Sequence, residues 1–245
     1  MKNERAEKIM EILEIRKHAS VEYLVNELHY SPATIRRDIT MLEKSGIAKK
    51  SYGGVSINEH SKSIILREHE YVEEKKKIAL AATKLISDND TVFIVGSSTT
   101  HIMGTHITDR KNITIVTPDI RLAFFFNENG IKCYCIGGKV SDNMMTGCIA
   151  INTIRQMHFD ICFFSISAIS NDGNMSSPSE DFAQMVRELI PRSDKTVCLC
   201  TSNKFERNRF ISCGDLDNID YLITDTPCQT ELVSKYPATQ FIVAD

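Results

Sequence analysis

The sequence lacks any apolar run long enough to cross a membrane. Its 245 residues are 42% hydrophobic and 25% charged, which is typical of an ordinary globular chain. The first 17 residues, MKNERAEKIMEILEIRK, are charged and repeat their apolar positions at helical spacing. They predict a helix rather than a secretory signal. We therefore expect a cytoplasmic protein with no membrane partner.

The sequence also lacks the C-x-x-C pairs of a structural zinc site. Its two C-x-C pairs, Cys133 with Cys135 and Cys198 with Cys200, lie inside apolar runs, where strand alternation places both thiols on one face. We interpret these four residues as small core side chains in a reducing compartment.

Signs of metal or catalytic chemistry are missing too. His101 and His106 are five positions apart, not the four that pair two ligands on a helix. No acidic residue completes a ligand set, and no nucleophile–base pair is visible. Asp172-Gly173 predicts a turn, and Asp215 with Asp217 a loop. We expect no metal, no cofactor and no enzyme activity.

A strong excess of one charge is absent, since the formal net charge is −3. Residues 1–57 carry ten basic and eight acidic side chains, whereas 58–245 carry nineteen and twenty-four. Within 31–52 there are five basic and two acidic residues. This segment is weakly basic, so charge alone does not identify a nucleic-acid partner.

Residues 1–57 predict three helices followed by a hairpin. Helices are indicated at 3–17, at 21–28 and from Pro32 onward, the second and third capped by Ser20 and Ser31. The third helix buries one stripe and stops at a glycine: Ile35, Ile39, Leu42 and Gly46. The segment 47-IAKKSYGGVSI-57 then forms a wing with a Gly-Gly turn. We predict a winged helix-turn-helix in 1–57, with the motif at about 20–39.

The remainder predicts a larger α/β domain at 78–245, after a polar linker and connecting helix at 58–77. Strands and helices alternate, which favours a Rossmann-like, mostly parallel sheet flanked by helices. The expected strands are 91–96, 113–117, 131–138, 160–169, 196–201, 220–224 and 240–244. The expected helices include 75–87, 119–128 and 179–191.

The third helix offers candidate DNA contacts on the side opposite its buried stripe. In a helix-turn-helix the first residues of this helix meet base edges in the major groove, and an arginine fork fits guanine or a phosphate. Lysines and a tyrosine on the wing are placed for phosphates or a neighbouring groove. The alternative is a solvated face with salt bridges to Asp38 or Glu43. The candidates are Ser31, Thr34, Arg36, Arg37, Lys49, Lys50 and Tyr52.

Three polar loops follow strands of the predicted sheet. The first, Gly96-Ser97-Ser98-Thr99-Thr100, has small residues and hydroxyls before a helix, which suits an anion such as a phosphate. Gly137-Gly138 ends another strand, and 201-TSNKF-205 provides Lys204 as a cation. Ligands of parallel sheets gather outside the carboxyl ends of the strands. These loops favour an anion-binding crevice, although a Gly-Ser/Thr turn often only caps a helix.

These residues resemble the DeoR family of bacterial transcriptional regulators over nearly the whole chain. The match is closest at 34-TIRRDI-39, Leu42-Glu43, Gly46 and Gly53-Gly54. It is looser beyond them. Arg67, Glu74-Lys75 and Ile78-Ala79 resemble the entry to the family's sensor domain, GSSTT its Gly-Thr/Ser loop, Gly137-Gly138 its LGG turn and Gly147 a following glycine. 199-LCTSNKF-205 resembles "LaDxSKF", and 220-DYLITD-225 the closing strand.

The resemblance implies a phosphosugar-isomerase-like sensor domain that mediates homo-oligomerisation. It also implies binding to double-stranded operator DNA, usually as a repressor released by a phosphorylated sugar. Three positions depart from the family: Ile94 and Thr201 replace carboxylates, and Pro118, followed by Asp119, replaces an asparagine. A different effector, a weak response or a sensor that has lost its ligand would fit these departures. An isomerase-like enzyme with an appended DNA-binding domain is the alternative from another class.

Overall fold

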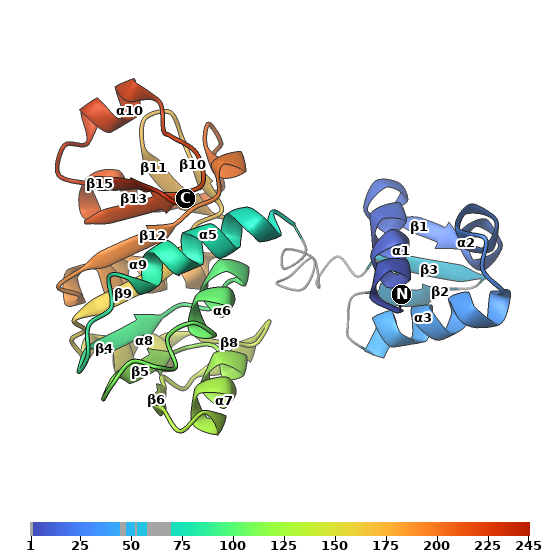
Figure 1. The fold of residues 1–245 in the computed structure, drawn as a ribbon, viewed down its shortest axis with the longest axis horizontal. Coiled ribbons are helices and arrows are strands. Elements are labelled where there is room, and N and C mark those ends of the chain that lie inside the picture. Colours follow the sequence, from blue (N-terminus) through green and yellow to red (C-terminus); the bar gives the residue numbers. More distant parts are fainter. Residues whose placement is uncertain (1, 45–47, 52, 58–69) are drawn as a thin grey trace. The chain divides into compact units, whose positions relative to one another are not determined.

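The computed structural model describes residues 2–44, 48–51, 53–57 and 70–245. The chain divides into two compact units between Glu70 and Tyr71 (Figure 1). The predicted helix stop at Gly46, the wing residue Tyr52 and the segment 58–69 lie outside the described residues. The predicted connector 58–77 ends inside a helix of the second unit, because that helix starts at Val72.

The first unit contains the three predicted helices and the predicted hairpin. The helices are α1 (Lys2–Arg16), α2 (Val21–Leu28) and α3 (Pro32–Lys44), and the strands are β1 (His18–Ser20), β2 (Ala48–Ser51) and β3 (Gly54–Ile57). β3 pairs antiparallel with both β1 and β2. The pattern did not indicate β1, since three residues are too short to show alternation.

The expected stripe of α3 forms much of the first unit's core. Ile35, Ile39 and Leu42 are at most 2% exposed and pack with residues of α1 and α2. Ser20 caps α2 as predicted, its hydroxyl accepting from the Tyr23 N–H at 3.0 Å. Gly54 is required where β3 passes β1, because a Cβ there would collide with the Ala19 carbonyl. Burial and capping thus fix which face of α3 points outward.

The second unit is built on a seven-stranded sheet in the order β15-β14-β12-β9-β4-β5-β6, and every neighbouring pair is parallel. All seven predicted strands are present. They are β4 (Thr91–Ile94), β5 (Thr114–Thr117), β6 (Lys132–Cys135), β9 (Ile161–Ser165), β12 (Thr196–Leu199), β14 (Tyr221–Thr224) and β15 (Gln240–Val243). The central strands are apolar throughout because helices cover both faces.

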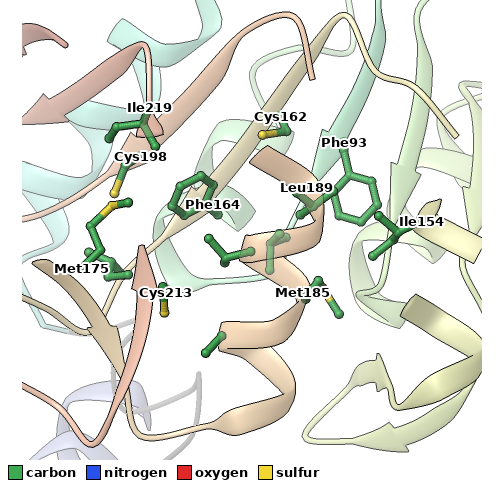
Figure 2. Close-up of a cluster of buried hydrophobic side chains, with 14 of the residues drawn as sticks. Phe93, Ile154, Cys162, Phe164, Met175, Met185, Leu189, Cys198, Cys213 and Ile219 are labelled. Atoms are coloured by element: carbon green, nitrogen blue, oxygen red, sulfur yellow. The ribbon is translucent and has the colours of Figure 1, made fainter. Parts of the chain in front are cut away.

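Helices pack on the two faces of this sheet. One core cluster joins the sheet to α5 (Val72–Thr83), α6 (Ser98–Gly104) and α7 (Ile120–Glu128). The other joins it to α8 (Cys148–Arg155) and α9 (Glu180–Leu189), and Figure 2 shows Phe93 and Phe164 beside Met185 and Leu189 of α9. Such a double-sided core agrees with the predicted α/β class. No helix among the described residues is long and apolar enough to span a membrane.

Several smaller elements were not predicted. They are β7 (Lys139–Ser141), β8 (Met144–Thr146), β10 (Ala168–Ile169), β11 (Asn174–Ser177), β13 (Ile211–Asp215), α8 and α10 (Thr230–Lys235). β7 pairs with β8, and β11 pairs antiparallel with β10 and β13. The predicted strand 160–169 is split into β9 and β10. These strands are too short, or too polar, for periodicity to reveal them.

The core assignment of the cysteines was half right. Cys198 and Cys200 are fully buried, as expected, and burial raises the pKa of the Cys200 thiol to about 12. Cys133 is only half-buried and Cys135 is exposed. The reason is topological: β6 is the last strand of the sheet, so it is less covered than a central strand.

Candidate DNA interface and effector crevice

The outer side of α3 presents two arginines. Arg36 and Arg37 are exposed, while Ile35 between Thr34 and Arg36 is completely buried. Both arginines stand within the first two turns of the helix, where a helix-turn-helix meets base edges. The helix therefore offers two guanidinium groups to a partner outside the unit.

The carboxylates that the alternative interpretation assigned to these arginines are bound elsewhere. Asp38 is 3% exposed and accepts hydrogen bonds from Arg5 of α1, one of them 3.0 Å long. Glu43 pairs with Lys50 of the wing, with 2.7 Å between Oε2 and Nζ. Among the described residues neither Arg36 nor Arg37 has an ion-pair partner. This favours the DNA interpretation over a helix face closed by internal salt bridges.

The hydroxyls at the start of α3 have an internal role. The Ser31 Oγ accepts a hydrogen bond from the Thr34 N–H at 3.3 Å and lies 2.9 Å from the Thr34 Oγ1. Ser31 therefore caps α3, as predicted. Since the two hydroxyls already contact each other, the arginines are the stronger candidates for reading bases.

The two lysines of the wing differ in whether they form an ion pair. Lys49 and Lys50 are both exposed, but only Lys50 is paired, through its contact with Glu43. A groove of about 360 Å³ runs between α3 and the wing, and its lining includes Arg36, Thr40, Lys50 and Gly53. The basic side chains of its lining, Arg36 and Lys50, suit a DNA phosphate.

In the second unit, the Ser97 and Thr100 hydroxyls of the loop after β4 form hydrogen bonds within the loop and to Val95, the residue after β4. Ser97 is the N-cap of α6, accepting from the Thr100 N–H at 3.1 Å, while the Thr100 Oγ1 accepts from the Ser97 N–H and donates to the Val95 carbonyl. Ser98 and Thr99 are buried. The capping function that the sequence left as an alternative is thus real for Ser97 and Thr100.

A buried carboxylate lies against the glycine of this loop. Asp119 is 0% exposed, caps α7 through the N–H groups of Arg121 and Leu122, and lies 2.8 Å from the Nε2 of His101. A Cβ at Gly96 would collide with the Asp119 carboxylate. Gly96 is therefore needed for Asp119 whether or not a ligand approaches.

The electrostatics of Asp119 follow from these contacts. Burial opposes ionisation of the carboxyl, but the hydrogen bond and charge of His101, with the Leu122 N–H and the charge of Arg121, lower its pKa below the usual value. Arg121 Nη2 also lies 3.3 Å from His101 Nε2. Motif reasoning considered His101 only as a metal ligand and missed this cluster; the sequence signal was Asp119 directly before a helix.

Gly137 and Gly138 directly precede β7 and Gly147 directly follows β8, so the pairing of these two strands brings the predicted glycines together. A Cβ at Gly138 would strike the Thr146 carbonyl, and Gly147 is the N-cap residue of α8 with a φ of +85°. A 2.8 Å hydrogen bond from the Met145 N–H to the Pro118 carbonyl holds the β7–β8 hairpin against the loop after β5. Gly138 is thus needed for close backbone packing, whereas Gly137 and Gly147 provide positive φ values of +75° and +85°.

Lys204 reaches the same end of the sheet from β12. Its Nζ lies 3.0 Å from the Ser165 Oγ, at the end of β9, and β9 is the neighbour of β4. The Lys204 side chain and the Gly96 loop thus flank one strand end, as the strand order requires. Ser165, which motif reasoning missed, lies between them.

The two absent carboxylates have different consequences. Ile94 is completely buried in the core, so its side chain lies away from the crevice. Thr201 is 2% exposed and donates to Asn203, while the neighbouring β14 supplies Asp225, which accepts from both the N–H and the Oγ of Ser202 at 2.7 Å. An acceptor is thus present at this strand end despite the substitution at 201.

Two family models match the chain. The DeoR-like helix-turn-helix domain matches residues 5–61, and the DeoR C-terminal sensor domain matches residues 70–226. The boundary between them falls where the structure divides into two units.

Curated relatives cover almost the whole chain. The transcriptional regulator GolR of Listeria innocua is 29% identical over 95% of this chain and 94% of its own. The glycerol-3-phosphate regulon repressor of Haemophilus influenzae is 28% identical over 91% and 89%, and its L-fucose operon activator 25% over 91% and 92%. Among solved structures, ribose 5-phosphate isomerase A from Neisseria gonorrhoeae aligns over 54% of this chain and 52% of its own, with 13% identity and a TM-score of 0.40. From its two domain matches and these relatives, the chain belongs to the DeoR family of transcriptional regulators.

Proposed function

We propose that the protein represses a carbohydrate-utilisation operon, binding its operator through α3 and the wing. The observation that carries this proposal is the exposed Arg36–Arg37 pair, whose neighbouring carboxylates are bound by other basic residues. A planar guanidinium binds a guanine or a phosphate through two hydrogen bonds. Reading two half-sites requires two copies, so we propose a homo-oligomer that acts on chromosomal DNA in the cytoplasm.

We further propose that a phosphorylated sugar or a similar metabolite releases the operator. Relatives include a glycerol-3-phosphate regulon repressor, which supports a phosphate ester as the effector. Lys204 provides a cation at the strand ends, 3.0 Å from Ser165, and a lysine binds a phosphate group as a point charge. The name of the L-fucose operon activator keeps activation as the alternative outcome of DNA binding.

Catalysis is not part of the proposal. The carboxylates at this end of the sheet are engaged, Asp119 in a helix cap and Asp225 with Ser202. A general base must be within hydrogen-bond reach of a substrate proton. These two carboxylates already accept hydrogen bonds from the protein itself, so neither is a good candidate for that role. Incubation with a panel of sugar phosphates checks this, since turnover of any of them would favour the isomerase-like alternative.

The decisive experiment measures operator binding with and without candidate effectors. Fluorescence anisotropy with DNA from upstream of the neighbouring genes is titrated with the protein, and sugar phosphates are then added. We expect at least one phosphate ester to weaken binding by tenfold or more, and Lys204→Ala to bind DNA normally but resist release. Lys195→Ala, an exposed lysine of the same unit, is the matched control. Normal release of Lys204→Ala would remove Lys204 from the site.

A further inference from the structure

A second cavity lies beside the crevice and has different chemistry. It encloses about 140 Å³ and is lined by the turns that follow β10, β12 and β14, together with α10. Figure 1 shows β10, β11 and α10 gathered at one end of the second unit. The cavity is at the carboxyl ends of parallel strands, where α/β folds place ligands. Of the loop 201–205 assigned above to the phosphate crevice, Ser202 and Phe205 line this cavity, whereas Lys204, the Gly96 loop and the residues of the DNA interface do not.

The charge of the lining excludes a phosphate. Ten residues form the walls, and none of them is lysine, arginine or histidine. The single charged group is Glu206, whose carboxylate accepts a hydrogen bond from the Gln229 side-chain amide. An anion here would meet a negative charge with no cation to compensate it. The cavity is therefore suited to an uncharged ligand.

The shape of the lining combines an apolar side with a polar rim. Phe205 and Leu232 pack against the hydrophobic core and supply apolar surface. Asn171, Thr226 and Gln229 surround it with amides and a hydroxyl. The Asn171 side chain has no hydrogen-bond partner among the described residues, so its donors and acceptor are available to a ligand.

We infer that this cavity binds an unphosphorylated monosaccharide or polyol. A sugar ring presents C–H groups on its face and hydroxyls around its edge, which matches an aromatic wall with amide and hydroxyl groups at the rim. A cavity of about 150 Å³ holds one benzene ring, so the C–H face of a sugar ring can enter this cavity while its hydroxyls stay at the rim. The backbone at Glu206 has a φ of +59°, which non-glycine residues adopt mainly in turns.

The cavity is connected to the proposed effector crevice through one turn. Ser202 lines the cavity, and Lys204 belongs to the same 3-10 turn, Ser202–Lys204. A neutral sugar in the cavity would therefore bias the position of the lysine that contacts Ser165. This site goes beyond the proposed release by phosphate esters, since it gives the regulator a second, uncharged signal.

Calorimetric titration of the full-length protein tests the inference, with D-ribose, D-glucose, xylitol and glycerol as probes. We expect at least one probe to bind saturably with one site per chain. Thr226→Phe fills the rim from an exposed position and should weaken that binding tenfold or more. Thr230→Phe, also exposed but outside the cavity lining, should bind like the wild type. Asn171→Ala should weaken binding, whereas Asn208→Ala, exposed and outside the lining, should not.

Two results would overturn the inference: no saturable binding of any of the four probes, or unchanged binding in Thr226→Phe. Failure of the proposed function looks different, because it concerns phosphate esters and DNA release. Lys204→Ala should still bind the neutral probe saturably while losing its response to phosphate esters. A response to phosphate esters without any neutral binding would refute the cavity alone.

Discussion

At the scale of single residues, the contacts of the carboxylates decide which cations are available to a partner. Asp38 is bound to Arg5 and Glu43 to Lys50, so Arg36 and Arg37 extend outward with their charge uncompensated by the described residues. The same logic applies inside the second unit, where Asp119 is satisfied by a histidine and two backbone amides. Whether a charged side chain can bind another molecule therefore depends more on its contacts within the protein than on its residue type.

Arg37→Ala should weaken operator binding by about 1–3 kcal/mol and relax base preference at one position, because a bidentate contact to guanine is lost. Anisotropy titrations against the operator and single-base variants measure both effects. Lys195→Ala removes one positive charge from the second unit and should change neither quantity. Equal affinities for wild type and Arg37→Ala would exclude Arg37 as a base contact.

Asp119→Asn should destabilise the protein by about 1–3 kcal/mol near pH 7, because buried donors lose a charged acceptor. The folded-state pKa of Asp119 is lowered, so its stabilisation is present above the unfolded value of about 4 and is lost as pH falls through the folded value. Urea unfolding from pH 7 to pH 3 should therefore show the variant and wild type converging at low pH. Asp109→Asn, exposed in a loop, should run parallel to the wild type.

At the scale of elements, α3 and the wing are joined by the Lys50–Glu43 pair, and the groove between them carries Arg36 and Lys50. Lys49 is exposed beside them and has no ion-pair partner among the described residues. Neighbouring lysines of one strand thus differ in how much charge they can offer to DNA.

Lys49→Ala should lower the slope of log affinity against log salt by about 0.9, the value for one lost phosphate contact. Lys50→Ala should lower it by less, because Glu43 already compensates part of the charge. Glu43→Gln should strengthen binding by freeing Lys50. Operator titrations at several salt concentrations supply the three slopes, and equal slopes for the two lysine variants would contradict the assignment.

Much of the fold could be predicted from sequence because its elements carry strong periodicity. The stripe of α3 and the apolar runs of the central strands fix those elements locally. β1, the β7–β8 hairpin and β10 could not be predicted because two or three residues carry too little pattern, and β11 and β13 because they are rich in polar residues and glycine. The edge position of β6, which exposes Cys135, is a property of strand order and is invisible to alternation.

The candidate sites divide in the same way. Capping by Ser31 and Ser97 was readable, because caps depend on residues three apart. The partners of Asp119 and the contact of Lys204 with Ser165 join residues 18 and 39 positions apart. No local pattern encodes such pairs. The DNA-contact and effector residues proposed from sequence stay predictions until the variants are measured.

At the scale of the whole molecule, the proposed DNA contacts and the proposed ligand sites belong to separate compact units. Each unit has its own hydrophobic cluster, so each buries apolar surface without help from the other. The proposed release of DNA by a small molecule would therefore involve both folded units and every copy of the chain that binds the operator.

A fragment of residues 71–245 should therefore fold alone, unfold in one cooperative transition and keep the affinity of the full chain for a phosphate ester, yet bind no operator DNA. Circular dichroism, calorimetric titration and anisotropy check these three properties. A fragment without cooperative unfolding would show that the second unit depends on the first.

The capping box of α6 has a consequence for genetics. Ser97 and Thr100 use their hydroxyls to start a helix whose first residues are buried. Substitutions at these two residues should therefore unfold part of the protein, and cells degrade unfolded chains. In a screen for altered induction, such mutants should contain less regulator and express the operon constitutively. Substitutions at Lys204 should yield normal protein levels and permanent repression. Opposite colony phenotypes from two loops at one sheet edge would separate folding alleles from signalling alleles before any protein is purified.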